Sequence, residues 1–125
     1  MTGALNMKTV TITPGQPVLI SVTGNVATRV VTRFFWLPVS DSTVADQWDR
    51  DDGVVLSFDP AKVVAGQQNH LVFASRMAPV EAKNTNLFIT FQVRQGNTIL
   101  LQQTYAETTS DPTVPVAVDD GITLA

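Results

Sequence analysis

Residues Leu87–Tyr105 read LFITFQVRQGNTILLQQTY, and this stretch carries the clearest structural signal in the chain. Apolar side chains occupy every second position from Leu87 to Val93, and the alternation resumes at Ile99. A period of two is typical of a β-strand with one buried face. Between the two runs stands Gln95-Gly96-Asn97, whose glycine and asparagine suit a tight turn. The stretch therefore predicts two antiparallel strands joined as a hairpin.

The same period of two recurs along the rest of the chain. Further strands, each followed by Gly, Pro or Asn, are expected at residues 7–13, 18–22, 26–37, 54–58 and 69–77. No window of about 11 residues shows a helical period. About seven strands of this kind predict an all-β protein, an antiparallel sandwich or barrel, and we favour a β-sandwich of two sheets.

Composition limits the classes of protein that fit. The 125 residues are enough for one domain, and with 44% hydrophobic and 15% charged residues the chain is expected to fold. A net charge of −3 lacks the basic surplus that binding to nucleic-acid phosphates requires, so no nucleic-acid partner is expected. The absence of cysteine excludes disulfides and thiolate chemistry.

Targeting signals are not visible in the sequence. The first residues show no basic stretch followed by an apolar one, and the longest apolar run, residues 34–39, is far too short to span a membrane. We therefore expect no membrane partner, and a cytoplasmic or virion-assembled location.

Residues for catalysis are scarce. The single histidine, His70, falls inside an expected strand, where a surface or hydrogen-bonded imidazole is the commoner case, and glutamate occurs only at Glu81 and Glu107. The serine-hydrolase and zinc-protease motifs are missing. We therefore predict a noncatalytic protein, with no catalytic residues and no required cofactor.

Residues 38–53 form the longest segment without a strand pattern, and we expect a loop there. Six aspartates and one arginine lie between Asp41 and Asp59. Clustered carboxylates suit Ca²⁺, and Asp49, Asp51 and Asp52 are the candidate metal ligands. Their spacing does not fit an EF-hand loop. The other interpretation is a solvated turn whose aspartates accept backbone N–H groups.

Trp48 stands among acidic residues in the same segment. A sugar site combines an aromatic platform with polar side chains, and Trp48 with Asp46, Asp49 and Asp51 offers that set. A carbohydrate-binding module, assisted by Ca²⁺, is therefore the alternative function. The tryptophan could equally close one end of the sandwich as a lid.

Assembly through protein contacts is the leading functional hypothesis. Only three lysines are present to guard exposed sheet edges. The faces expected to point outward are instead rich in uncharged polar residues, namely Thr9, Thr11, Thr28, Thr32, Thr90, Gln92, Gln102, Gln103 and Thr104.

The end of the chain adds to this hypothesis. We expect residues 1–107 to form the sandwich domain and residues 108–125 an extended C-terminal arm. The arm alternates apolar residues that would contact a neighbouring subunit: Val114, Val116, Val118, Ile122 and Leu124. The alternative is that it folds back as the last strand of its own domain. The expected partners are proteins, in a homo-oligomer or a protein lattice.

The opening Lys8-Thr-Val-Thr-Ile-Thr-Pro-Gly-Gln-Pro17, together with a cysteine-free composition rich in Thr, Val and Gln, supports a resemblance. The chain resembles the immunoglobulin-like or jelly-roll β-sandwich modules of bacteriophage virions, such as capsid decoration and tail proteins, and of bacterial surface proteins. The cysteine pair of antibody domains is missing, so only the architecture transfers. The resemblance implies noncatalytic attachment to a protein lattice or a cell-surface ligand.

Overall fold

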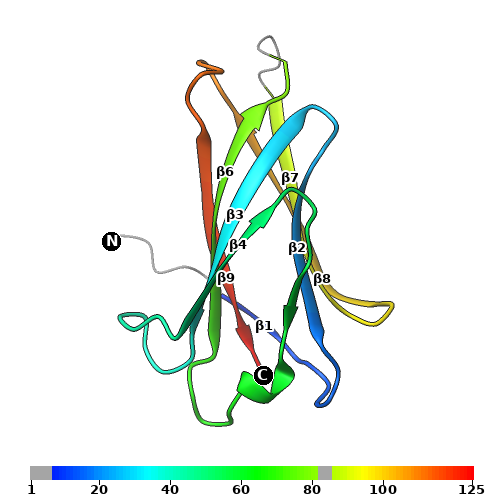
Figure 1. Cartoon of the computed structure of the whole chain (residues 1–125), viewed down its shortest axis with the longest axis vertical. Coiled ribbons are helices and arrows are strands. Elements are labelled where there is room, and N and C mark those ends of the chain that lie inside the picture. The colour runs from blue at the N-terminus through cyan, green and yellow to red at the C-terminus, as the bar shows by residue number, and fades with distance from the viewer. Residues whose placement is uncertain (1–6, 82–85) are drawn as a thin grey trace.

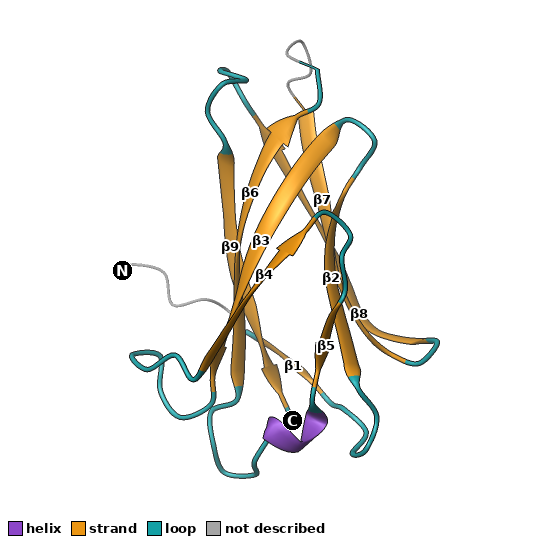
Figure 2. Cartoon of the chain, in the orientation of Figure 1, coloured by secondary structure: helices purple, strands orange, loops and turns teal. Residues whose placement is uncertain are grey.

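The computed structural model describes residues 7–81 and 86–125, and these fold into two β-sheets packed face to face (Figure 1), called the sandwich below. The strands are β1 (Lys8–Val10), β2 (Val18–Gly24), β3 (Thr28–Leu37), β4 (Asp46–Asp51), β5 (Leu56–Phe58), β6 (His70–Pro79), β7 (Asn86–Gln95), β8 (Thr98–Thr108) and β9 (Val116–Leu124). A single 3-10 turn, η1 (Pro60–Lys62), is the helical element of the described chain (Figure 2). The all-β prediction is confirmed.

The two sheets draw on strands from the whole length of the chain. Sheet A has five strands in the order β1-β9-β6-β3-β4, and sheet B has four in the order β5-β2-β7-β8. Neighbouring strands are antiparallel, apart from β1, which runs parallel to β9. Because the chain crosses repeatedly between the sheets, both depend on contacts between residues distant in sequence.

The core lies between the sheets and follows the predicted alternation. In β7 the side chains of Leu87, Ile89, Phe91 and Val93 are buried. Phe91 stacks on Phe73 of β6, with ring centroids 4.6 Å apart. The hairpin predicted from Leu87–Tyr105 is confirmed as β7 and β8, and Gly96 in its turn adopts a φ of 55°.

The segment 38–53 contains a strand where we expected only a loop. Residues Asp46–Asp51 form β4, which pairs with β3 through partners such as Trp48 opposite Phe34. β4 is an edge strand with alternating exposed positions, and those positions carry polar residues. Its one apolar residue is Trp48, so the alternation of hydrophobicity that identifies a strand is nearly absent.

The C-terminal arm is also corrected by the structure. Residues Val116–Leu124 form β9, which lies inside sheet A between β1 and β6. Val118, Ile122 and Leu124 are buried in the chain's own core, Val116 packs against that core, and Val114 lies outside the strand and is exposed. The alternation therefore belongs to a strand of the domain, and Val116, Val118, Ile122 and Leu124 pack within their own chain rather than on a neighbour.

Candidate functional site

The acidic residues of the 41–59 segment have separate partners. The Asp46 carboxylate lies 2.9 Å from Lys62 Nζ, and Asp49 lies 2.7 Å from Arg33 Nε. The Arg33 hydrogen bond lowers the pKa of Asp49. The backbone N–H of Gly24 donates to Asp52 at 2.9 Å. The candidate metal ligands Asp49, Asp51 and Asp52 are not gathered, and residues 7–81 and 86–125 contain no group of three or more acidic, histidine or cysteine side chains that could hold a metal ion.

Trp48 packs inward. Its ring meets Phe58 edge-on at a centroid distance of 6.0 Å, and Phe58 also contacts Trp36 at 4.8 Å. Asp49 and Asp51 occupy the alternate, exposed positions of β4, and so face away from the Trp48 ring. The structure therefore splits the residues proposed for sugar binding between two faces, with Trp48 placed as a lid over the core.

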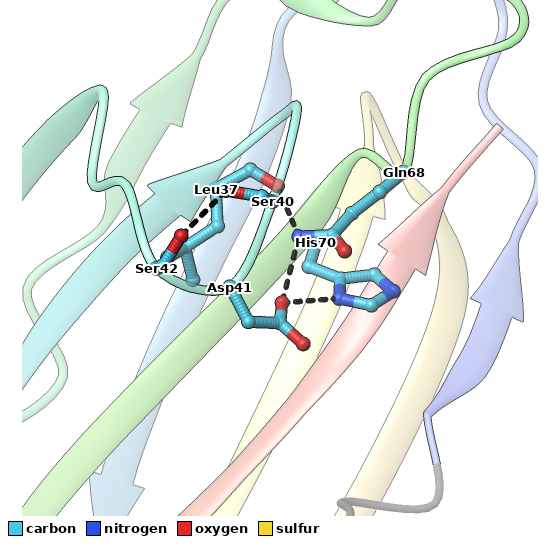
Figure 3. Close-up of polar contacts among 6 residues, drawn as sticks. All are labelled: Leu37, Ser40, Asp41, Ser42, Gln68 and His70. Atoms are coloured by element: carbon cyan, nitrogen blue, oxygen red, sulfur yellow. Dashed lines mark hydrogen bonds and ion pairs between the residues drawn. The ribbon is translucent and has the colours of Figure 1, made fainter.

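His70 belongs to a small polar cluster that ties the 38–45 segment to β6 (Figure 3). Its Nδ1 lies 2.9 Å from Asp41 Oδ1, which also accepts a hydrogen bond of 2.7 Å from Gln68 Nε2. Gln68 Nε2 donates to the carbonyl of Leu37 as well. Ser40 and Ser42 bond to each other at 3.0 Å on the far side of Asp41 from the imidazole (Figure 3). The cluster therefore fixes a loop and places no hydroxyl against His70.

A hollow of about 840 Å³ opens at the end of the sandwich near η1. Its walls are mainly apolar, with Ile12, Val63 and Leu124 among them. Asp59 is the ionisable side chain among its described lining residues, and it accepts the N–H of Ala61 at 2.9 Å. The hollow is therefore an apolar volume with one carboxylate side chain among its described lining residues.

Tyr105 and Asp120 connect the two sheets along one open side. The Tyr105 hydroxyl of β8 donates to Asp120 Oδ2 of β9, and Asp120 Oδ1 accepts the Gly121 N–H. The Tyr105 ring lies edge-on against Phe73 at 5.9 Å. Burial, together with the Asp120 carboxylate, raises the pKa of Tyr105. This bond holds β8 in place relative to sheet A.

The outer face of sheet B is uncharged over most of its area. Two cross-strand rows run over it, Thr23 to Thr90 to Thr104 and Ser21 to Gln92 to Gln102. The Thr90 and Thr104 hydroxyls are 3.3 Å apart, and Gln92 Nε2 donates to Gln102 Oε1 at 3.0 Å. Rows of this kind stabilise neighbouring strands without adding charge.

The edge of sheet B is formed by β8, which has β7 on one side and no described strand on the other. Its eleven residues, TILLQQTYAET, include no lysine, arginine or proline and one acidic residue, Glu107. A register shift at Val93 and Arg94 leaves Leu100 without a cross-strand partner near the turn. Figure 2 shows the β7–β8 turn standing out from the rest of the molecule at one side. Beyond this irregularity, none of the described strands pairs with the outward row of backbone groups of β8.

Part of the uncharged outer face was predictable from the sequence. Thr90, Gln92, Gln102 and Thr104 lie on the outer face as expected. Thr28 and Thr32 were placed outward wrongly, since both are buried, and Gln103 lies on the inner side of β8 opposite Phe91. The Tyr105–Asp120 bond was missed. Its signal was available, because Asp120 falls on the inward, otherwise apolar positions of β9.

No protein-family model matches the chain, and neither a curated protein nor a solved structure does. Within the part of the chain that the structure describes, no helix is both long and apolar enough to cross a membrane. The function is therefore inferred from the geometry of the chain itself.

Proposed function

We propose that the protein is a noncatalytic assembly subunit that works through protein–protein contacts, and that the edge strand β8 is its contact surface. The observation that carries the proposal is the long β8 edge with one charged residue. An exposed edge of this kind offers unpaired N–H and C=O groups, which a strand from another chain can pair with. Natural sheets usually protect such an edge.

The other sheet edges of this molecule are protected. β4 carries four charged residues among its six, DQWDRD. β1 and β5 are only three residues long. β1 pairs only with Ile122–Leu124, and the part of β9 that it leaves uncovered carries Asp119 and Asp120. Short or charged edges resist pairing with another chain. The contrast singles out β8.

The setting and the finer fold are part of the same proposal. The two packed sheets agree in architecture with the immunoglobulin-like or jelly-roll modules that the sequence resembles. We place the protein on that basis among virion or surface-assembly subunits, of the capsid decoration or tail type. The proposal assigns no catalytic residue.

The native mass in solution tests the proposal. We expect light scattering to give a mass above the 13.5 kDa of one chain, rising with concentration and unchanged by Ca²⁺ or a chelator. A mass that stays at one chain up to the solubility limit would contradict it.

A panel of glycans tests the rival function in parallel. Because Trp48 packs against Phe58, we expect no glycan to bind. Glycan binding by a monomeric chain that is lost in Trp48→Ala would favour the carbohydrate module instead.

A further inference from the structure

We infer that the partner of the β8 edge is a second copy of the chain, and that two β8 strands pair antiparallel about a two-fold axis at Gln103. The inference rests on the proposed function and names its partner. Two four-stranded sheets B would then join into one continuous sheet. The pairing closes on itself, because the same surface is used by both copies and no β8 edge is left open.

The sequence of β8 is complementary to itself in this register. Residues equally distant from Gln103 face each other, so Gln102 lies opposite Thr104 of the second copy. Leu101 lies opposite Tyr105, both on the inner side of the strand. No two like charges meet along the strand, and cross-strand pairs of this type are stabilising.

The half-buried apolar side chains of β8 support the same register. Leu101 and Tyr105 pack against the core from the inner side of β8, but as residues of an edge strand they remain partly exposed. In the proposed dimer Leu101 of one copy covers Tyr105 of the other, and the reverse pair forms on the opposite side of the axis. The Tyr105–Asp120 hydrogen bond holds the strand in place before pairing, which lowers the conformational entropy lost on association.

The outer face continues across the axis as well. The rows that end in Gln102 and Thr104 on one copy meet the rows that end in Thr104 and Gln102 on the other. Both copies present their uncharged faces on the same side of the joined sheet, since a two-fold axis perpendicular to the sheet relates them. A charged edge such as β4 could not extend these rows without placing Asp49 or Asp51 beside them.

Paired lysine substitutions test the inference against a matched control. Gln102→Lys with Thr104→Lys places a lysine directly opposite a lysine of the second copy at two positions. Ser21→Lys with Thr23→Lys adds the same charge in the same two rows, on β2. We expect the β8 variant to raise the dimer dissociation constant at least about tenfold and the β2 variant to change it less than about threefold. Thermal unfolding and circular dichroism of both variants check that they fold.

The outcomes separate this inference from the proposed function. If the wild-type chain associates and the β8 variant associates equally well, the β8 pairing and β8 as the contact surface are both overturned, while the noncatalytic assembly role stands. If the β2 variant alone dissociates, the outer face is the contact and the edge is not. A wild-type chain that remains monomeric overturns both.

The register has its own test, because the chain contains no cysteine. We expect a mixture of Gln102→Cys and Thr104→Cys chains to form a disulfide-linked dimer on mild oxidation, several-fold faster than either variant alone. Links between like positions that form faster than the mixed link would overturn the Gln103 axis. Failure of all links in a chain that dimerises would overturn β8 pairing altogether.

Discussion

The outer faces of the two sheets are built from different chemistry. Sheet A carries ion pairs, with Arg33 at 2.7 Å from Asp49 and Arg76 at 3.1 Å from Asp119. The outer face of sheet B carries rows of threonine and glutamine instead. Charged groups keep their water, and removing that water costs free energy, so a charged face resists being covered. Uncharged hydroxyls and amides lose less on burial, so the comparison agrees with the proposal that the contact is made by sheet B, at its β8 edge.

The largest effect is expected where the two sheets meet. Phe91→Ala removes the ring that stacks on Phe73 and leaves a cavity, so the free energy of unfolding should fall by about 3 to 5 kcal/mol. Phe88→Ala is the control on the same strand, because its side chain is 39% exposed on the outer face. We expect it to cost below about 1 kcal/mol. Urea unfolding followed by tryptophan fluorescence measures both, and equal losses would contradict the assignment of faces.

A buried hydroxyl pair inside sheet A should have an intermediate effect. Thr32 Oγ1 and Ser75 Oγ are 2.8 Å apart and link β3 to β6 within the core. Ser75→Ala leaves the Thr32 hydroxyl buried without this partner and should cost about 2 kcal/mol. Adding Thr32→Val should restore part of the loss, since neither polar group then remains. A double-mutant cycle with no coupling energy would show that the pair does not interact.

The bond between the sheets at Tyr105 should have a smaller effect on stability, together with a pH signature. Tyr105→Phe removes the hydrogen bond to Asp120. Because the ring is partly exposed, we expect the free energy of unfolding to fall by at most about 1 kcal/mol. The folded pKa of Tyr105 is raised. The stabilisation is therefore complete below the unfolded pKa of about 10 and is lost as pH rises above it.

This titration can be observed directly. Tyr105 is the only tyrosine of the chain, so phenolate absorbance reports on it alone. We expect a midpoint above 10, the ordinary value, in the folded protein. A midpoint at the ordinary value would contradict the partial burial of Tyr105 together with its bond to Asp120.

The smallest effect is expected on the outer face of sheet A. Arg33 and Asp49 are exposed, so Arg33→Ala should leave the urea midpoint unchanged at neutral pH. The pKa of Asp49 is lowered in the folded chain, so any contribution of the pair is present above the ordinary aspartate pKa and is lost as pH falls through the lowered value. Arg76→Ala, which removes the second ion pair, should behave in the same way. A clear loss in either variant would show that sheet A depends on its charged face.

Local patterns explain which parts of the fold the sequence could predict. The β7–β8 hairpin was predictable because its two strands and the Gly96 turn are neighbours in the chain. β4 was not, because an edge strand that buries one side of Trp48 needs no apolar alternation. For β9 the alternation was recognised, but its partner was not. Whether Val118 and Ile122 pack on their own sheet or on a neighbour depends on contacts with residues far away in the chain.

The uncharged outer face of sheet B was predictable in composition and unpredictable in arrangement. Uncharged residues such as Thr90 and Thr32 look alike in the sequence, yet one lies on the outer face and the other is buried beside Ser75. Which residues share a face depends on strand register, and a shift of one residue exchanges the two faces. The unguarded edge of β8 was a second unknown, since only the strand order shows which strand is last in its sheet.

The position of β9 affects how the protein is made. β9 is synthesised after the other eight strands of the sandwich, yet it occupies an inner place in sheet A, against β6 and β1 (Figure 1). Until it has been synthesised, the growing chain exposes the edge of β6 and leaves β1 without its partner. The contacts that complete the sheet join residues near Lys8 to residues near Ile122, and loop closure over such a distance slows folding. Nascent chains halted before β9 should therefore recruit chaperones, whereas the β7–β8 hairpin can form as soon as it emerges.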